Sequence, residues 1–240
     1  MSENQTQQSN EEYFIVDDPD DPFELPEPDP EEEKKRQEEE RKRQEEERKK
    51  KIEEEEKKRL AEQFHTDNSA SRRLLTDLRT IMHSDSQKLG FSTMPKGNNI
   101  FIWEVKVFGF EKGSDMYNDL QKYKQMKGID YVEMSITFPN NYPFKPPFVR
   151  VVKPRFMFHT GHITVGGSIC ADILTMESWS PINDIESLMV NVISEIINGK
   201  PRIDFSYLEP YTLEEAKSAY VRVASEHHWK ISDWLPKDEE

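Results

Sequence analysis

Apolar and polar positions follow two different patterns along the chain, and the change between them falls near residue 66. Up to that point charged side chains dominate and apolar ones are scattered. Beyond it, the spacing of apolar residues predicts strands over 103–107, 132–138 and 148–152. Helical spacing predicts amphipathic helices over 74–82 and 185–197 and a third after residue 212, while 115–127 is typical of a more polar helix.

The predicted helices carry recognisable start and stop signals. Ser69 and Ser71 are the expected N-caps of the first helix, and Gly199 ends the long apolar helix. A capping box from Thr212 to Glu215 opens the last helix, which then places His227 on the apolar face. The order of helix, strands, loop and helices predicts an α+β domain over 66–240.

The first 65 residues are expected to stand outside this domain. Residues 1–33 hold 13 acidic and no basic side chains among several prolines, which predicts a disordered acidic tail. Residues 34–65 contain a repeat of seven, 36–42 and 43–49, in which Glu precedes a cation by four positions. Such pairs favour a solvated helix, and without an apolar seam a charged helical spacer is predicted rather than a coiled coil.

Charge and composition exclude several classes of function. The net charge of −14 comes almost entirely from the tail, because residues 64–240 hold 20 basic and 23 acidic side chains. No basic face is therefore expected, and no nucleic-acid partner. There is no run of 18 apolar residues and no signal-peptide pattern, so we expect no membrane association and a cytoplasmic or nuclear location. The single cysteine, Cys170, excludes an intrachain disulfide and a multi-cysteine zinc site.

Three motifs resemble the ubiquitin-conjugating enzymes, in the order and spacing of that family. They are Phe138-Pro-Asn-Asn-Tyr-Pro-Phe-Lys-Pro-Pro-Phe-Val-Arg150, Gly167-Ser-Ile-Cys-Ala-Asp-Ile-Leu174 and Trp179-Ser-Pro181, and the likeness covers about residues 70–235. The resemblance implies that family's fold, an antiparallel meander sheet packed on helices. Within the family the chain looks most like the Q subfamily, on the stretches 70–74, 118–121, 148–152, 199–202 and 236–239.

The resemblance implies a chemistry for Cys170. In the family, a cysteine takes the C-terminal carboxyl of ubiquitin from an activating enzyme as a thioester and passes it to a substrate, with or without a ubiquitin ligase. A thiolate both attacks and leaves readily, so it suits acyl transfer. ATP is consumed by the activating enzyme, and no cofactor or metal is expected in this chain.

The chain departs from the family pattern ahead of the cysteine. Most members carry His-Pro-Asn with the Asn eight residues before the cysteine, whereas His162 occupies that position here. His159-Thr-Gly161 has neither the Pro nor the Asn, so we do not transfer the role to it. His162 could donate an N–H to the oxyanion or accept a proton from the incoming nucleophile. The alternative is a loop histidine that only packs or forms hydrogen bonds.

Extra histidines near a thioester would suit a hydroxyl acceptor, because a Ser, Thr or sugar hydroxyl is a weak nucleophile until a base takes its proton. The Q subfamily has a His in its last helix followed by a Trp, which implies His227 and, of Trp229 and Trp234, the latter. A packed histidine at the helix edge is the alternative for His227. Lysine remains open as the acceptor.

The resemblance also gives roles to residues on either side of this centre. Asp172 matches an acid that orients or deprotonates the acceptor, with capping of the short turn after Cys170 as the alternative. Phe144, Ser180 and Pro181 match the two loops that contact ligases. Two other functions stay open: a catalytically weak or inactive ubiquitin-binding scaffold with the same fold, and a conjugating enzyme for a ubiquitin-like modifier.

Overall fold

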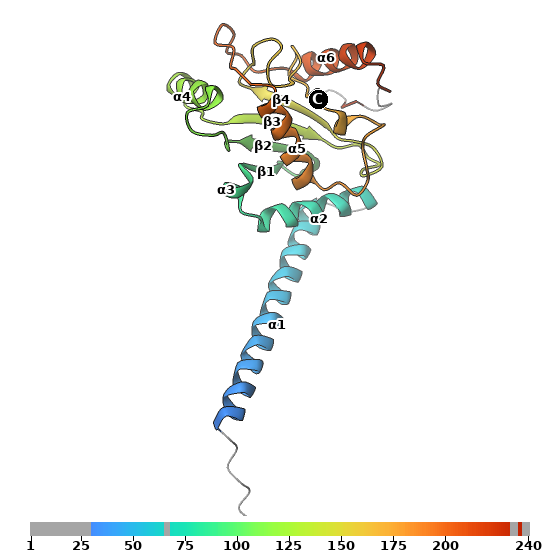
Figure 1. Ribbon diagram of the computed structural model, residues 1–240. Coiled ribbons are helices and arrows are strands. Elements are labelled where there is room, and N and C mark those ends of the chain that lie inside the picture. Colours follow the sequence, from blue (N-terminus) through green and yellow to red (C-terminus); the bar gives the residue numbers. More distant parts are fainter. Residues whose placement is uncertain (1–29, 65–67, 231–234, 237–240) are drawn as a thin grey trace, which may run out of the picture. The chain divides into compact units, whose positions relative to one another are not determined.

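The computed structural model describes residues 30–64, 68–230 and 235–236 (Figure 1). Contacts divide the chain into two units, Met1–Ile52 and Glu53–Glu240. The expected disordered tail lies outside the described residues except for residues 30–33, which are helical. None of the helices in the described ranges has an apolar stretch long enough to cross a membrane.

Helix α1 (Pro30–Phe64) contains the seven-residue repeat. Two of the Glu-to-Lys pairs four residues apart close at 2.9 Å, Glu38 with Lys42 and Glu45 with Lys49. The last turns of the helix are different, because Leu60 and Phe64 are buried in the hydrophobic core of the second unit. These two apolar residues lie inside the range expected for the charged spacer.

Four strands form one antiparallel sheet in the order β1-β2-β3-β4, which confirms the predicted meander. The strands are β1 (Phe91–Lys96), β2 (Asn99–Val107), β3 (Val132–Thr137) and β4 (Phe148–Lys153). Alternation along β2 and β3 places Val105 opposite Met134 and Trp103 opposite Ile136, all buried on the same face. The sequence prediction missed β1, an edge strand in which only two positions are buried and Pro95 interrupts the pattern.

The helices around the sheet are α2 (Ser69–His83), α3 (Ser86–Leu89), α4 (Asp115–Lys127), α5 (Ile185–Asn198) and α6 (Leu213–Glu226). Neither predicted N-cap of α2 is right: Asn68, one position before Ser69, caps the helix, and Ser71 closes its capping box. The box from Thr212 to Glu215 does open α6 as predicted. The four-residue helix α3 was too short for its spacing to predict.

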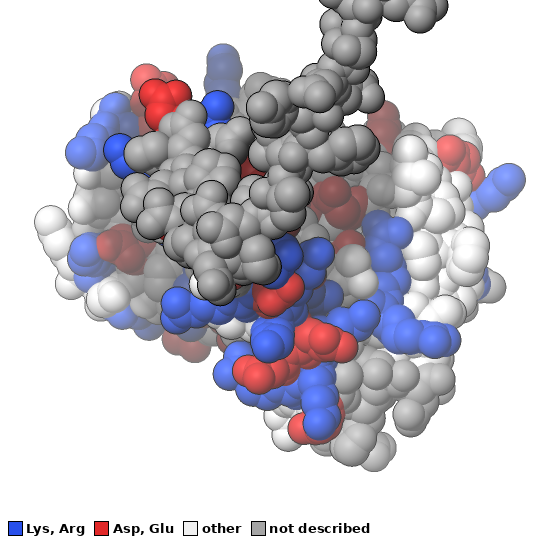
Figure 2. Space-filling view, turned by 90° about the horizontal axis from the view of Figure 1, so that it is seen from below, with Lys and Arg blue, Asp and Glu red and all other residues white. Residues whose placement is uncertain are grey.

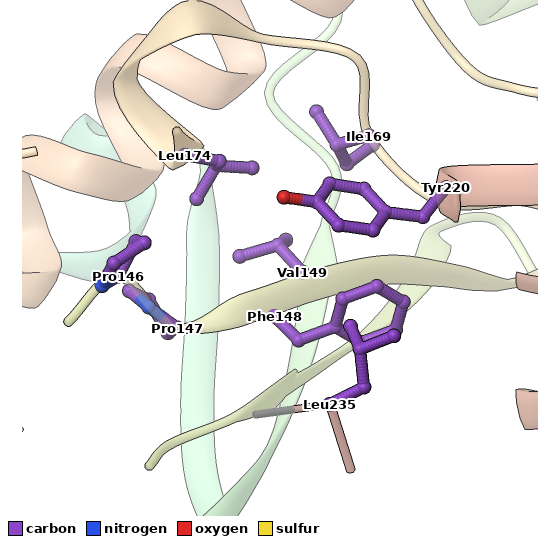
Figure 3. A pocket seen from close by; sticks show the side chains of 8 residues that line it. All are labelled: Pro146, Pro147, Phe148, Val149, Ile169, Leu174, Tyr220 and Leu235. Atoms are coloured by element: carbon purple, nitrogen blue, oxygen red, sulfur yellow. The ribbon is translucent and has the colours of Figure 1, made fainter. Parts of the chain in front are cut away.

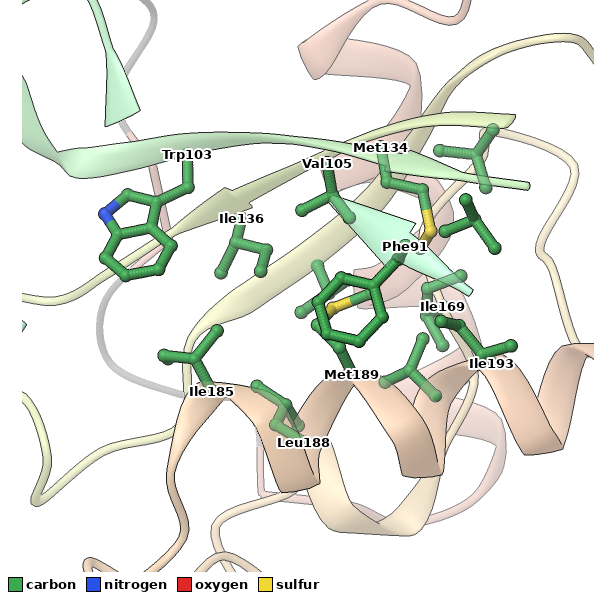
Figure 4. Packing of buried hydrophobic residues seen from close by; sticks show 14 of the residues in the cluster. Phe91, Trp103, Val105, Met134, Ile136, Ile169, Ile185, Leu188, Met189 and Ile193 are labelled. Carbon is green, nitrogen blue, oxygen red and sulfur yellow. The ribbon is translucent and has the colours of Figure 1, made fainter. Parts of the chain in front are cut away.

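The core lies between the sheet and α5. Figure 4 shows Ile185, Leu188, Met189 and Ile193 pointing from this helix toward side chains of the strands, and all four are buried. The helix N-cap, Asp184, accepts a hydrogen bond from the Ser187 N–H at 2.7 Å. Burial of this stripe fixes α5 across one face of the sheet and confirms the predicted α+β class.

The face of the molecule in Figure 2 carries both signs of charge. Lysine and arginine side chains lie among aspartate and glutamate side chains, not in one continuous basic patch.

Candidate active site

Cys170 lies opposite His162 in a short hairpin. Ile163 and Ile169 pair as an antiparallel bridge, and the N–H of Cys170 donates to the carbonyl of His162 at 2.9 Å. The N–H of Thr164 in turn donates to the carbonyl of Ser168 at 2.9 Å. His162 and Cys170, eight residues apart in sequence, are therefore paired across the hairpin, and backbone hydrogen bonds hold their two segments together.

The two glycines of the hairpin turn allow α6 to pack directly on it. Gly167 has φ +92°, and a Cβ there would lie 2.7 Å from the ring of Tyr211. A Cβ on Gly166 would overlap the carbonyl oxygen of Glu215 in the first turn of α6. The glycine pair thus sets how close the last helix comes to the cysteine hairpin.

Arg155 anchors the first turn of α6. Its guanidinium donates to both carboxylate oxygens of Glu215, at 2.8 and 2.9 Å, and to the carbonyl of Glu209 at 2.9 Å. The same group lies 4.4 Å from the ring centroids of both Tyr207 and Tyr211. This packing of a planar cation between two rings fixes the start of the helix that ends at His227.

The residues flanking Cys170 in sequence pack into an apolar cluster on one side of the hairpin. Figure 3 shows Ile169 and Leu174 beside Tyr220 of α6, with Phe148 of β4 and Leu235 on the other side of the ring. The cavity between these side chains is only about 10 Å³, which is too small for a ligand. This cluster therefore holds the cysteine segment in place and is not a binding site.

An open pocket of about 550 Å³ lies on the side of the hairpin where Cys170 is accessible. His159, His162 and His227 all line it together with Cys170. The structure therefore brings together three of the predicted site residues, Cys170, His162 and His227, from the hairpin and the end of α6.

The surroundings of Cys170 disfavour its thiolate. The thiol is partly buried, and this burial raises its pKa; the nearby carboxylate of Asp172 raises the pKa further. Asp172 is the first residue of the 3-10 helix η1 (Asp172–Leu174) and is exposed. The N-cap of that turn is Ala171, which makes no side-chain capping bond. Asp172 therefore does not cap the turn, in contrast to the alternative considered from the sequence.

His227 is the C-cap of α6, and its side chain is exposed. The apolar stripe of α6 does not bury this side chain, because the helix ends at Glu226 before the stripe reaches this position. The imidazole stacks on the indole of Trp229, with centroids 5.1 Å apart and an angle of 23°. Trp234, the tryptophan that we favoured from the sequence, lies outside the described residues.

His162 has an exposed side chain and a left-handed backbone with φ 51°. A residue with a Cβ is strained in this region, and such strain persists only where the surroundings fix it. Here Gly199 lies against His162, so close that a Cβ on the glycine would come within 2.8 Å of the imidazole Cδ2. The glycine that ends α5 thus leaves the space in which His162 turns toward the pocket.

Phe144, Ser180 and Pro181 lie on two loops that the structure joins. The indole N–H of Trp179 donates to the carbonyl of Pro143 at 2.7 Å, which connects the loop of Phe144 to the loop of Ser180 and Pro181. Phe144 and Pro181 are exposed and Ser180 is half-buried. These three residues lie outside the group that lines the cysteine pocket.

The sequence analysis did not identify the residues that fix these loops. Arg73 of α2 donates to the carbonyls of Pro181 and Asn183 at 3.1 and 2.7 Å, and its Nε pairs with Asp77 at 3.0 Å. Burial raises the pKa of Asp77 and outweighs the positive charge of Arg73 and the hydrogen bond from the Tyr142 hydroxyl, which both lower it. The Arg-to-Asp spacing of four on a helix was the available signal.

Within the described ranges, no group of three or more His, Cys, Asp or Glu side chains could hold a metal ion. Phe158, His159, Val165, Arg222 and Glu226 also line the pocket, and the sequence analysis assigned them no role. No spacing rule would have found Phe158 and His159, because the loop that carries them reaches the pocket only through the fold.

A family model described as ubiquitin-conjugating enzyme matches residues 73–224, more than half of the chain. Ubiquitin-conjugating enzyme E2 Q1 of Mus musculus and of Homo sapiens is 34% identical over 160 residues, 66% of this chain and 37% of the relative. Ubiquitin-conjugating enzyme E2 25 of Caenorhabditis elegans is 30% identical over 163 residues, 66% of this chain and 42% of the relative. The chain thus spans about 37% to 42% of the length of these relatives.

Among solved structures, human ubiquitin-conjugating enzyme E2 G1 aligns with a TM-score of 0.42 and 25% identity, over 54% of this chain and 96% of that one. The family match and the relatives named E2 Q1 confirm the resemblance seen in the sequence. The chain belongs to the ubiquitin-conjugating enzyme family.

Proposed function

We propose that this chain carries ubiquitin as a thioester on Cys170 and transfers it to a substrate hydroxyl or lysine. The observation that supports this function is the shared pocket: Cys170 opens into the same space as the imidazoles of His162 and His227. A nucleophile and two groups able to carry protons are thereby placed around one cavity large enough for an acceptor.

In the first step, the Cys170 thiolate attacks the carbonyl carbon of the ubiquitin C-terminus, which arrives as a thioester on the activating enzyme. A new C–S bond forms, and the bond to the activating enzyme's sulfur breaks and releases that sulfur as a thiolate. Because the pKa of the Cys170 thiol is raised, its proton must leave before the attack, and the departing thiolate of the activating enzyme takes up a proton in exchange. ATP has already been consumed by the activating enzyme.

In the second step, the oxygen of a hydroxyl acceptor attacks the same carbonyl carbon. The hydroxyl proton passes to an imidazole, either His162 or His227, and the collapse of the oxyanion breaks the C–S bond and returns the Cys170 thiolate. An amine acceptor follows the same route, with an amide as the product. Asp172 lies on the first turn after Cys170 but not among the residues that line the pocket, and its match to the family's acid is what supports a role in orienting the incoming group.

The surface formed by Phe144, Ser180 and Pro181 is the proposed contact for a ubiquitin ligase. An exposed aromatic ring and an exposed proline on two joined loops suit a small, transient interface. The support for this role is the match of these residues to the ligase-binding loops of the family.

The test is to incubate the full chain with activating enzyme, ATP and ubiquitin, and to separate the products without reductant. We expect an adduct that reductant removes and that Cys170→Ala abolishes. The adduct is then exposed to free serine, threonine and lysine. Discharge to serine or threonine should fall at least about 100-fold in His162→Ala or His227→Ala, as expected for loss of a general base.

His228→Ala is the matched control, because His228 is also exposed and adjacent to His227 but does not line the pocket. Discharge to lysine alone would contradict transfer to hydroxyls. Failure to charge, under conditions that charge another conjugating enzyme, would instead favour a ubiquitin-binding scaffold. Charging with a ubiquitin-like modifier but not with ubiquitin would reassign the cargo.

A further inference from the structure

The pocket beside Cys170 has an apolar part that the transfer chemistry does not need. Phe158 and Val165 line it, and their side chains are 71% and 55% exposed. They come from different places, Phe158 from the loop before the hairpin and Val165 from the hairpin turn itself. Single exposed apolar side chains are common on protein surfaces, but two that line the same pocket as the nucleophile are typical of a ligand-binding site.

The ring of Phe158 contacts the side chain of the next residue. It meets the imidazole of His159 edge to face, with centroids 3.9 Å apart and an angle of 68°. His159 has a left-handed backbone with φ 62°, a conformation that persists in a residue with a Cβ only when its surroundings hold it. The backbone beside Phe158 is therefore fixed, while the ring itself stays exposed to a ligand.

The loop that carries this pair is fastened at both ends to the segment after α5. The N–H of Met157 donates to the carbonyl of Arg202 at 2.8 Å, and the N–H of Gly161 donates to the carbonyl of Gly199 at 2.8 Å. Arg202 is itself held by Asp119 of α4, which accepts from its Nε at 2.8 Å. The aromatic wall of the pocket is therefore built into the domain and does not depend on a free loop.

From this arrangement we propose that Phe158 and Val165 form a subsite for a bulky apolar side chain next to the acceptor residue of the substrate. The inference rests on the proposed function, because the thioester on Cys170 fixes where the acceptor must lie. Its nucleophilic atom must come within about 3.5 Å of the carbonyl carbon. A neighbouring side chain of the same peptide then reaches the wall of the same pocket, where burial against Phe158 stabilises the complex.

The chemical class of substrate is therefore a peptide in which the Ser, Thr or Lys acceptor is flanked by Leu or a similar residue. The first probe is a fluorescent, end-blocked Gly-Leu-Ser-Leu-Gly peptide, compared with Gly-Gly-Ser-Gly-Gly, titrated against the uncharged full chain by fluorescence polarisation. We expect the leucine peptide to bind about tenfold more tightly. Phe158→Ala and Val165→Ser should each reduce this ratio toward one.

Met157→Ala is the matched control, since Met157 is the adjacent residue, is 48% exposed and does not line the pocket. This variant should keep the full preference for the leucine peptide. Equal affinities for the two peptides, or a preference that survives Phe158→Ala, would overturn the proposal. Urea unfolding of each variant shows whether the fold is intact.

The second measurement is discharge of the Cys170 thioester onto the same pair of peptides and onto their lysine counterparts. The leucine peptides should half-saturate the rate at about tenfold lower concentration, whichever acceptor is used. Because the binding assay uses uncharged protein, a chain that forms no thioester still gives a result for the subsite. Failure of the proposed function and failure of the subsite are thereby separate outcomes.

Discussion

The raised pKa of Cys170 has a consequence for the proposed transfer. A thiol of higher pKa is a stronger nucleophile once deprotonated, but as a leaving group it departs more slowly. A thioester on Cys170 is then less easily displaced by water or by a hydroxyl that has no help. Transfer to a hydroxyl therefore depends more strongly on a base that takes the acceptor's proton. His162 and His227, which line the pocket, are the candidates for this base.

Asp172→Asn should lower the pKa of the Cys170 thiol. Burial is the larger cause of the raised pKa and remains in the variant, but the repulsion between the carboxylate and the thiolate is removed. The rate of alkylation by iodoacetamide, followed as a function of pH, should rise with deprotonation of the thiol. We expect the whole profile of the variant to move to lower pH.

Glu111→Gln is the control for this shift, since Glu111 is an exposed carboxylate that does not line the cysteine pocket. Its profile should match that of the unmodified chain. An alkylation profile that does not move in Asp172→Asn would show that the Asp172 carboxylate has no effect on the cysteine.

Single residues also show where sequence reasoning succeeds and where it stops. The role of Cys170 is predicted from its flanking motif. Its position opposite His162 follows from their spacing of eight residues, because the hairpin pairs the two residues across its strands. His227 is different, because the sequence continues a helical stripe that the structure ends one residue earlier. Phe158 reaches the pocket through left-handed backbone and long-range hydrogen bonds, which leave no periodic signal.

At the scale of elements, the spacing of apolar residues predicts the helices and strands that have one clearly buried face. Burial on β3 alternates strictly, so its type and position follow from the sequence. Strand β1 has a partner on one side only, and Pro95 removes a backbone donor there, so its pairing becomes apparent only in the sheet. The placement of α6 depends on glycines that periodicity does not consider.

Gly166→Ala should move α6 away from the cysteine hairpin. The added methyl group would overlap the Glu215 carbonyl oxygen, which belongs to the backbone and cannot turn aside. We expect a loss of about 1 to 3 kcal/mol in the free energy of unfolding, measured in urea. The rate of discharge to serine should fall more than the extent of charging, because His227 moves with the helix while Cys170 stays in the hairpin.

Gly97→Ala serves as the comparison, because no atom lies within 4 Å of a Cβ at that position. It adds a methyl group without a collision, and any loss of stability from the positive φ of Gly97 is one that Gly166→Ala does not share. Equal rates of serine discharge in the two variants would mean that the contact with α6 does not position the transfer site.

Arg155→Lys should loosen the start of α6 while keeping the positive charge. Lysine cannot donate to Glu215 and Glu209 in the same fork, nor lie flat between Tyr207 and Tyr211. The expected loss is about 1 to 3 kcal/mol in urea unfolding, from hydrogen bonds to a charged group. A variant as stable as the unmodified chain would show that charge alone, without the planar fork, anchors the helix.

At the scale of the whole molecule, the folded unit extends further toward the N-terminus than the composition suggests. Charged side chains dominate the sequence up to Arg59, yet the second unit starts at Glu53. The carboxylate of Glu53 forms an ion pair with the guanidinium of Arg79 in α2 at 2.6 Å. The carboxylate of Glu56 lies 3.6 Å from the imidazole Nε2 of His83. One continuous helix therefore carries both a solvated segment and a segment that belongs to the domain.

Leu60→Ala tests how much this segment contributes to the stability of the domain. Leu60 is 5% exposed and lies in the main core cluster, so its truncation should cost about 2 to 4 kcal/mol in the free energy of unfolding. Ile52→Ala is the matched control on the same helix, because Ile52 is 56% exposed and should change stability by no more than about 0.5 kcal/mol. Urea titrations of both variants in the full chain measure the difference. If the two substitutions cost the same, the end of α1 does not pack on the domain, and residues up to 65 act as a separate spacer, as the charge pattern alone predicts.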